Sequence, residues 1–195
     1  MPWDVAGSLY VAGTTARACI DAVRVRPATP WSWRGPRAAS ASSRHSWRFW
    51  RARAVVATAS RENHAFLVDL GAIPVEYARG WSTASARSCP TGVDAFIDTH
   101  GDGNVEAAIA LGVDRDRITP SRIGRPARNT GCGSTGMSAV PPRETLVELA
   151  RLVAAGELDL PIAATFPLDQ VRAAYERLAK RHGLGKIVLE ISPAH

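Results

Sequence analysis

Two strand-like runs, each followed by a helix-like run, limit most strongly what this chain can fold into. Residues 54–59 form a short β-branched run, and residues 62–70 follow with apolar side chains on one side. Residues 93–99 are a second candidate for a buried strand, followed by a helix that Asn104 caps and that ends at Gly112. This spacing predicts an α/β fold with a parallel sheet, in which residues 54–59 and 93–99 lie side by side.

The last third of the chain has the most regular pattern. Apolar residues at positions i, i+3, i+4 and i+7 predict a helix over residues 146–153, with Gly156 beyond its end. Asp169 is expected to cap a second helix, and residues 186–191 predict a closing strand. The expected inner face of the second helix consists of Val171, Ala174, Tyr175 and Leu178.

Three segments interrupt this regularity. Residues 29–53, 78–88 and 119–135 are rich in Arg, Ser, Ala, Pro and Trp and show no sustained apolar period. The net charge of +6 at pH 7 would favour nucleic acid as a partner. However, residues 29–53 contain six arginines and no acidic residue, so the basic excess is local. The alternative hypothesis is a basic protein that binds nucleic acid through this Arg/Trp-rich segment, or a non-catalytic interaction protein.

Composition narrows the class of protein further. The three cysteines, Cys19, Cys89 and Cys132, are too far apart for a CxxC-type site, so we expect free thiols and no metal. No run approaches the roughly 18 to 20 apolar residues of a membrane helix, and the first residues lack a secretory signal. We therefore expect no membrane association and a cytoplasmic protein.

Short stretches in the regular parts carry a family resemblance. They are residues 57–61 (ATASR), residues 92–101 (GVDAFIDTHG), residues 161–168 (PIAATFPL) and residues 185–189 (GKIVL). Together with residues 2–16, their order and spacing resemble the medium-chain dehydrogenase/reductase superfamily, in its zinc-independent, quinone-reductase-like branch. The resemblance implies an oxidoreductase that transfers a hydride from NADP(H) to a quinone or an enone.

The same resemblance implies a division of the chain. Residues 1–140 would form a Rossmann-like, doubly wound parallel sheet that is incomplete at the three irregular segments. Residues 141–195 would form a helix-strand-helix-strand segment that returns to a GroES-like catalytic domain. That domain would precede Met1 and is missing, which implies little or no turnover. Four apolar side chains are then expected to be exposed, namely Phe166, Val171, Tyr175 and Ile187.

The glycine-rich loop of the family should lie near residues 35–41, where this chain has only Gly35. With suitable third bases, the codons of residues 37–42 give Gly-Gly-Val-Gly-Val in a shifted reading frame. Residues 79–88 and 119–126 likewise give family-like sequence in that frame. The hypothesis is that paired frameshifts produced the irregular segments, and resequencing the gene would test it.

The turn after residues 54–59 bears on the choice of cofactor. An NAD site offers Asp or Glu to the ribose at this place, whereas this chain has Ser60 and Arg61. Arg61 could pair with a 2′-phosphate, and Ser60 or His64 could donate a hydrogen bond to it. The resemblance therefore favours NADP(H). The alternative is that Ser60 caps the helix and Arg61 is a solvated side chain.

Four further residues are candidates for contact with the cofactor. Thr99, His100 and Gly101 follow a strand expected to end at the cofactor crevice. Thr15 resembles a threonine that contacts the cofactor in the family. No catalytic residue is assigned, and the expected partners are a small-molecule quinone or enone and, by analogy, a second copy in a homodimer.

Overall fold

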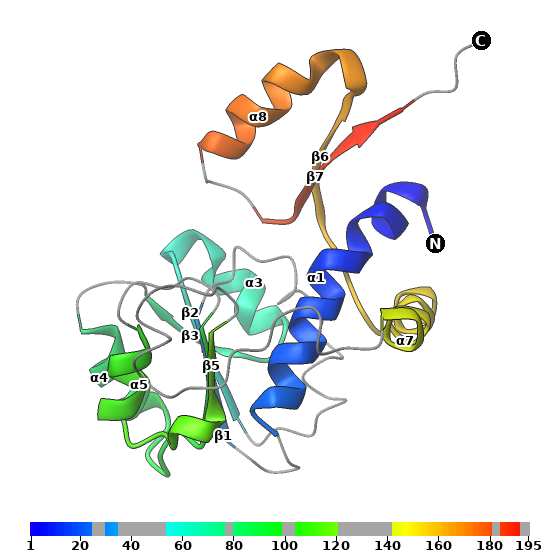
Figure 1. Ribbon diagram of the computed structural model, residues 1–195. Helices are drawn as coiled ribbons and strands as arrows, with labels where there is room; N and C mark the ends of the chain where they lie inside the picture. Colours follow the sequence, from blue (N-terminus) through cyan, green and yellow to red (C-terminus); the bar gives the residue numbers. More distant parts are fainter. Residues whose placement is uncertain are drawn as a thin grey trace.

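The main feature of the computed structural model is a five-stranded, fully parallel sheet with strand order β3-β2-β1-β4-β5 (Figure 1). The structure describes residues 1–24, 30–34, 54–76, 80–98, 104–120, 142–180 and 184–191. The strands are β1 (Pro30–Arg34), β2 (Ala54–Ala59), β3 (Ile73–Glu76), β4 (Ala95–Asp98) and β5 (Ile118–Pro120). This order confirms the doubly wound, Rossmann-like sheet expected from the sequence.

The central strand corrects one expectation. Residues 54–59 and 93–99 do supply parallel strands of one sheet, but they are not neighbours. Strand β1 lies between them, with Trp31 paired to Val55 on one side and to Ala95 on the other. The expectation was wrong because β1 falls in the irregular segment 29–53, whose pattern did not indicate a strand.

Helices cover both faces of the sheet. Helix α1 (Trp3–Ala22) and helix α3 (His64–Asp69) lie on one face, while α4 (Trp81–Ser88) and α5 (Asn104–Ala110) lie on the other. Side chains of a strand alternate between the two faces. Accordingly, one apolar cluster takes Val55, Ala57, Ala95 and Ile97, and the other takes Val56, Val75, Phe96 and Ile118.

Helix α4 forms within the irregular segment 78–88. It begins after Gly80, which has a left-handed backbone (φ 89°), and its Trp81 ring stacks on Phe96 with ring centroids 5.8 Å apart. Farther along the helix, Ser85 is fully buried, and its hydroxyl has no hydrogen-bond partner among the residues that the structure describes. The Trp81 ring therefore anchors this helix to the sheet, whereas the buried Ser85 hydroxyl weakens the same packing.

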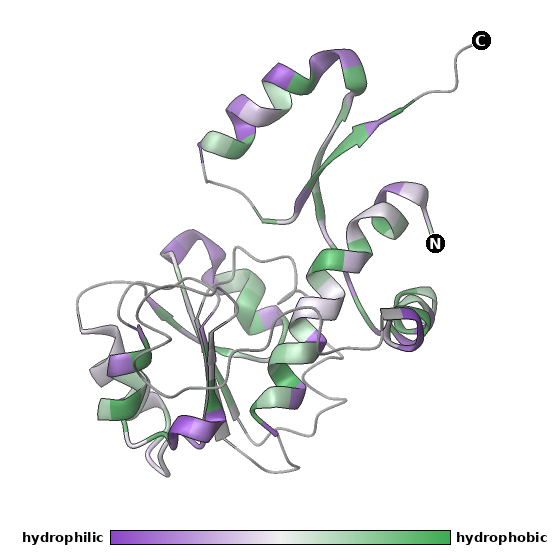
Figure 2. Cartoon of the chain, viewed as in Figure 1, coloured by the Kyte–Doolittle hydropathy of each residue, from purple (hydrophilic) through white to green (hydrophobic). Residues whose placement is uncertain are grey.

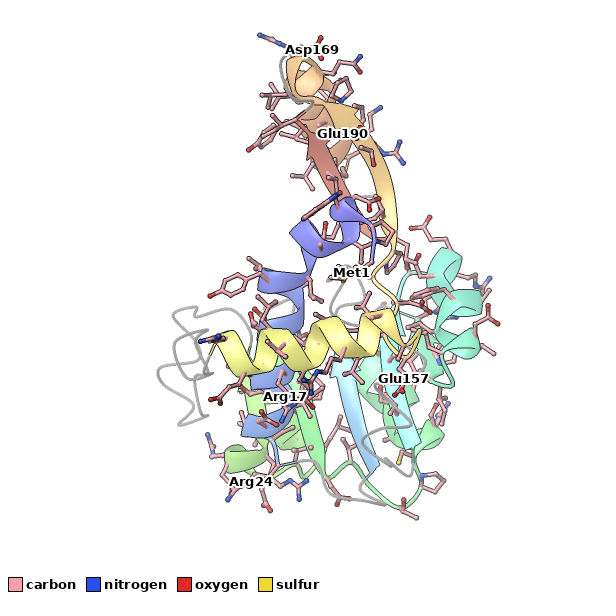
Figure 3. All side chains as sticks on the ribbon, turned by 90° about the vertical axis from the view of Figure 1, so that its right-hand side faces the viewer. Met1, Arg17, Arg24, Glu157, Asp169 and Glu190 are labelled. Atoms are coloured by element: carbon pink, nitrogen blue, oxygen red, sulfur yellow. The ribbon has the colours of Figure 1, made fainter. Side chains whose placement is uncertain are left out.

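Helix α7 (Pro142–Ala154) confirms the helix predicted over residues 146–153. Gly156 follows its end with a left-handed backbone (φ 68°), as expected. The helix packs on α1 through a third apolar cluster, and Figure 3 shows Arg17 where the two helices cross. The buried side chains of this cluster are Leu9, Ala12, Leu149 and Leu160.

Charge also joins these two helices. The Arg17 guanidinium donates to Asp21 in α1 at 2.8 Å and to Glu148 in α7 at 2.6 Å. Desolvation by burial acts to lower the pKa of Arg17, but the hydrogen bonds and charges of Asp21 and Glu148 outweigh it and raise the pKa. The guanidinium therefore stays charged and bridges α1 to α7.

A second, two-stranded parallel sheet consists of β6 (Ile162–Pro167) and β7 (Lys186–Glu190), joined through helix α8 (Val171–Ala179). It lies apart from the main sheet (Figure 1). The backbone amide of Lys186 donates to the Pro161 carbonyl at 2.8 Å. Gly185 is required there because a Cβ would come within 2.5 Å of that carbonyl oxygen.

Helix α8 is amphipathic, with hydrophobic and hydrophilic residues alternating along it (Figure 2), but only Ala174 is buried. Val171 and Tyr175 are exposed as predicted, whereas Phe166 and Ile187 are half-buried. Asp169 is not the helix cap, since it lies within a 3-10 turn, η5 (Leu168–Gln170), and Gln170 directly precedes α8. The turn inserted before the helix shifts the cap position past Asp169.

We expect Ser85→Ala to stabilise the fold. The substitution removes a buried hydroxyl that has no partner, and this should raise the free energy of unfolding by about 1 kcal/mol. Urea denaturation followed by circular dichroism measures the change. Ser88→Ala on the same helix is the matched control, because Ser88 is a half-buried residue whose hydroxyl already donates to the Ala84 carbonyl. A loss of stability in Ser85→Ala that exceeds the loss in the control would contradict the assignment.

Candidate functional site

The carboxyl ends of the parallel strands meet at one edge of the sheet. In doubly wound sheets a ligand binds outside this edge, at the point where the strand order reverses. Here the reversal lies between β1 and β4, whose last paired residues are Arg34 and Asp98. The glycine-poor segment 35–41 therefore begins at the end of the central strand, although residues 35–41 themselves lie outside the described residues.

Ser60 follows β2 at this edge and is exposed. Its hydroxyl donates to Glu62 Oε1 at 3.0 Å and accepts from Asn63 Nδ2 at 3.0 Å. Ser60 does precede the 3-10 turn η2 (Arg61–Asn63), but its side chain makes no capping bond to a backbone amide. The turn is thus held by a side-chain network rather than by the cap considered as the alternative role.

Arg61 is the one described cation of this turn, and 85% of its side chain is exposed. Its Nε lies 3.9 Å from Glu76 Oε2, and Glu76 is the last residue of the neighbouring strand β3. Such a long, solvated ion pair contributes little energy, so the guanidinium is accessible to another anion. His64 is half-buried, with Nε2 3.4 Å from the Ala59 carbonyl oxygen.

A buried polar pair marks the end of β4. Asp98 and Asn104 are each 2% exposed, and Asn104 Nδ2 donates to Asp98 Oδ1 at 3.0 Å. Asn104 is the first residue of α5, and its side chain bonds to the end of the strand. The pair fixes the start of α5 to the strand end beside the switch point. Asp94 is exposed, so the two aspartates of this strand segment have different surroundings.

The structure brings together only part of the site predicted from the sequence. Ser60, Arg61 and His64 lie within one turn at the carboxyl edge, whereas Thr15 is half-buried on α1. The remaining candidates, Thr99, His100 and Gly101, lie outside the described residues. Glu62, Asn63, Glu76 and Asn104 were not predicted as site residues; a signal for the first two was their position directly after the strand.

Cys19 and Cys89 are buried free thiols, and neither forms a disulfide within the described residues. Cys132 lies outside the described residues. Burial raises the pKa of the Cys19 thiol to about 11. Within the described ranges, no group of three or more His, Cys, Asp or Glu is placed to hold a metal ion. None of the helices in that same part of the chain is long and apolar enough to cross a membrane.

We expect Asn104→Ala to destabilise the fold by about 2 kcal/mol, because it removes a hydrogen bond to a buried carboxylate. Urea denaturation gives the free energy of unfolding. Asn63→Ala is the control, since it removes an amide bonded to the exposed Ser60, and there the loss should stay below about 1 kcal/mol. Equal losses of unfolding free energy in the two variants would show that the buried Asp98–Asn104 hydrogen bond stabilises the fold no more than the exposed one.

Cys19 should make stability depend on pH in alkaline solution. Its folded-state pKa of about 11 lies above the ordinary value of 9.0. Below pH 9 the thiol is therefore neutral in both the folded and the unfolded chain, and the free energy of unfolding keeps its full value. As pH rises from 9 to 11, the unfolded chain ionises first and stability falls, by up to about 2 to 3 kcal/mol. Thermal melts of the wild type and Cys19→Ala across this range measure the difference. Parallel pH profiles for the two proteins would refute the assignment.

A family profile and several solved structures match the chain. The profile of the family described as zinc-binding dehydrogenase matches residues 70–189, which is more than half of the chain. No curated protein shows significant sequence similarity. The family match includes helix α4 and the short strand β5, so it extends across two of the irregular segments.

Among the similar solved structures is the CurK enoyl reductase, at 19% identity and TM-score 0.79, covering 98% of this chain and 64% of that one. The quinone oxidoreductase from Coxiella burnetii is 25% identical, with TM-score 0.75, and the match covers 95% of this chain and 60% of that one. CurA from Vibrio vulnificus, solved in complex with NADPH, is 15% identical, with TM-score 0.73, and the match covers 94% of this chain and 63% of that one.

The chain therefore spans less than two thirds of the length of each of these relatives. Their described activities concern the longer proteins, while the likeness extends over nearly all of this chain. With the strand order, the family match and these neighbours in agreement, the chain belongs to the zinc-binding dehydrogenase family, within the medium-chain dehydrogenase/reductase superfamily.

Proposed function

We propose that this chain is the cofactor-binding part of an NADP(H)-dependent oxidoreductase whose substrate is a quinone or an enone. The observation that carries the proposal is the exposed Arg61 guanidinium at the carboxyl end of β2, one strand from the switch point. Dinucleotides bind along this edge in doubly wound sheets, with the adenosine ribose near the end of the second strand. The quinone oxidoreductase and enoyl reductase neighbours support the substrate class.

Chemistry at the turn supports a phosphorylated cofactor. A 2′-phosphate is doubly negative, and a guanidinium pairs with it through charge-assisted hydrogen bonds. Neither residue directly after β2 is a carboxylate, and the ion pair of Arg61 within the described part of the chain is the loose one with Glu76. Arg61 thus gives the turn a cation that can pair with the phosphorylated ribose, and the bound nicotinamide would supply the hydride.

The same proposal assigns different roles to the two parts of the chain. Residues 1–140 bind the cofactor, and residues 141–195 return toward a catalytic domain that completes the substrate pocket. The exposed apolar side chains of α8, which include Val171, Tyr175 and Leu178, support a docking role for this segment. In this proposal the protein acts in the cytoplasm and pairs with a second copy, as the sequence led us to expect.

Arg61→Ala tests the cofactor assignment. Loss of the guanidinium should weaken NADPH binding about tenfold and change NADH binding less than twofold, because only NADPH carries the 2′-phosphate. Titration followed by cofactor fluorescence measures both affinities. Arg172→Ala removes an exposed cation from α8, away from the main sheet, and serves as the control. Equal weakening for the two cofactors, or none, would rule out Arg61 as the phosphate ligand.

A further inference from the structure

The Ser60 hydroxyl is fully engaged within its own turn. It has one proton to donate, and that proton goes to the Glu62 carboxylate at 3.0 Å. It also accepts a hydrogen bond from the Asn63 side-chain amide at 3.0 Å. A phosphate oxygen can only accept, so Ser60 can bond to a 2′-phosphate only if it releases Glu62.

The charges around this hydroxyl oppose a phosphate as well. A phosphate in contact with Ser60 would lie within a few ångströms of the Glu62 carboxylate, where like charges repel. At the turn after β2, the Arg61 guanidinium lies 3.9 Å from the Glu76 carboxylate, and the neighbouring Glu62 carboxylate is bonded to Ser60. A phosphate at this turn would therefore be attracted by Arg61 and repelled by Glu62, with Glu76 of the neighbouring strand adding to the repulsion.

Glu62 is better placed than Glu76 to influence a ligand at this turn. Glu76 belongs to β3 and reaches Arg61 only at 3.9 Å, whereas Glu62 is bonded directly to Ser60. A cofactor without the 2′-phosphate presents a 2′-hydroxyl instead, and a hydroxyl can donate to a carboxylate. The same Glu62 side chain thus disfavours one cofactor and offers an acceptor to the other.

We infer that Glu62 is a specificity-determining residue, which holds the Ser60 hydroxyl and thereby lowers the preference for the phosphorylated cofactor that Arg61 provides. This inference rests on the proposed NADP(H) function. Arg61 and Glu62 act in opposite directions on one ligand group, so the ratio of the two affinities reflects their balance.

The test is Glu62→Gln, which removes the charge and replaces the charge-assisted hydrogen bond from Ser60 by a weaker neutral one, so that a phosphate can compete for the Ser60 hydroxyl. The ligands are 2′,5′-ADP and 5′-AMP, which differ in the 2′-phosphate, and their binding is measured by NMR titration of the full chain. Glu62→Gln should bind 2′,5′-ADP about fivefold more tightly and 5′-AMP no more tightly than the wild type. Glu176→Gln, which neutralises an exposed carboxylate on α8, should leave both affinities unchanged.

The possible outcomes distinguish failure of the inference about Glu62 from failure of the proposed NADP(H) function. Binding of 2′,5′-ADP that depends on Arg61 but not on Glu62 overturns the inference and leaves the proposed function intact. Failure of the wild type and the Glu62→Gln variant to bind either ligand overturns both. Ser60→Ala provides a second check, because without the hydroxyl the effect of Glu62→Gln should shrink to the through-space repulsion. Thermal melts of all variants exclude unfolding as the cause of any change.

Discussion

The pairing of β1 with β2 on one side and β4 on the other is the interaction on which the rest of the structure depends. These parallel ladders set the strand order and bring the ends of all five strands to one edge. They also give the sheet two buried faces, which require helices on both sides. Without β1, the two halves of the sheet would have no common strand, and the Ser60 turn would have no fixed relation to Asp98.

The two faces of this sheet differ in how well the side chains that cover them are packed and hydrogen-bonded. The face with α1 and α3 is built from aliphatic side chains and the buried Cys19 thiol. On the opposite face, α4 contributes the Trp81 ring but also the buried, unpartnered hydroxyl of Ser85. Ser85 belongs to the irregular segment 78–88, of which residues 79–88 give family-like sequence in a shifted reading frame. A polar group at a core position agrees with that hypothesis, since a helix selected for this face would place an apolar residue there.

The carboxyl edge combines two kinds of polar structure. The Asp98–Asn104 pair is buried and joins a strand to a helix, so it belongs to the framework. The groups around Ser60 are exposed and bonded to one another, so a ligand can reach them at little cost in desolvation. Cofactor choice at such a turn depends on the balance of a few exposed charges, while the crevice itself depends on the sheet.

The sequence by itself determined the local elements: the strands over residues 54–59, 93–99 and 186–191, the helix α7, and the turn that carries Ser60, Arg61 and His64. It could do so because β-branched runs, helical periodicity and glycine stops act over a few residues. Only the tertiary structure decided that β1 forms at all and separates β2 from β4, because strand pairing is a contact between distant segments. It likewise decided that Asn104 bonds to Asp98 and that Glu76 lies beside Arg61, since a side chain chooses its partner only after the sheet has brought the strand ends together.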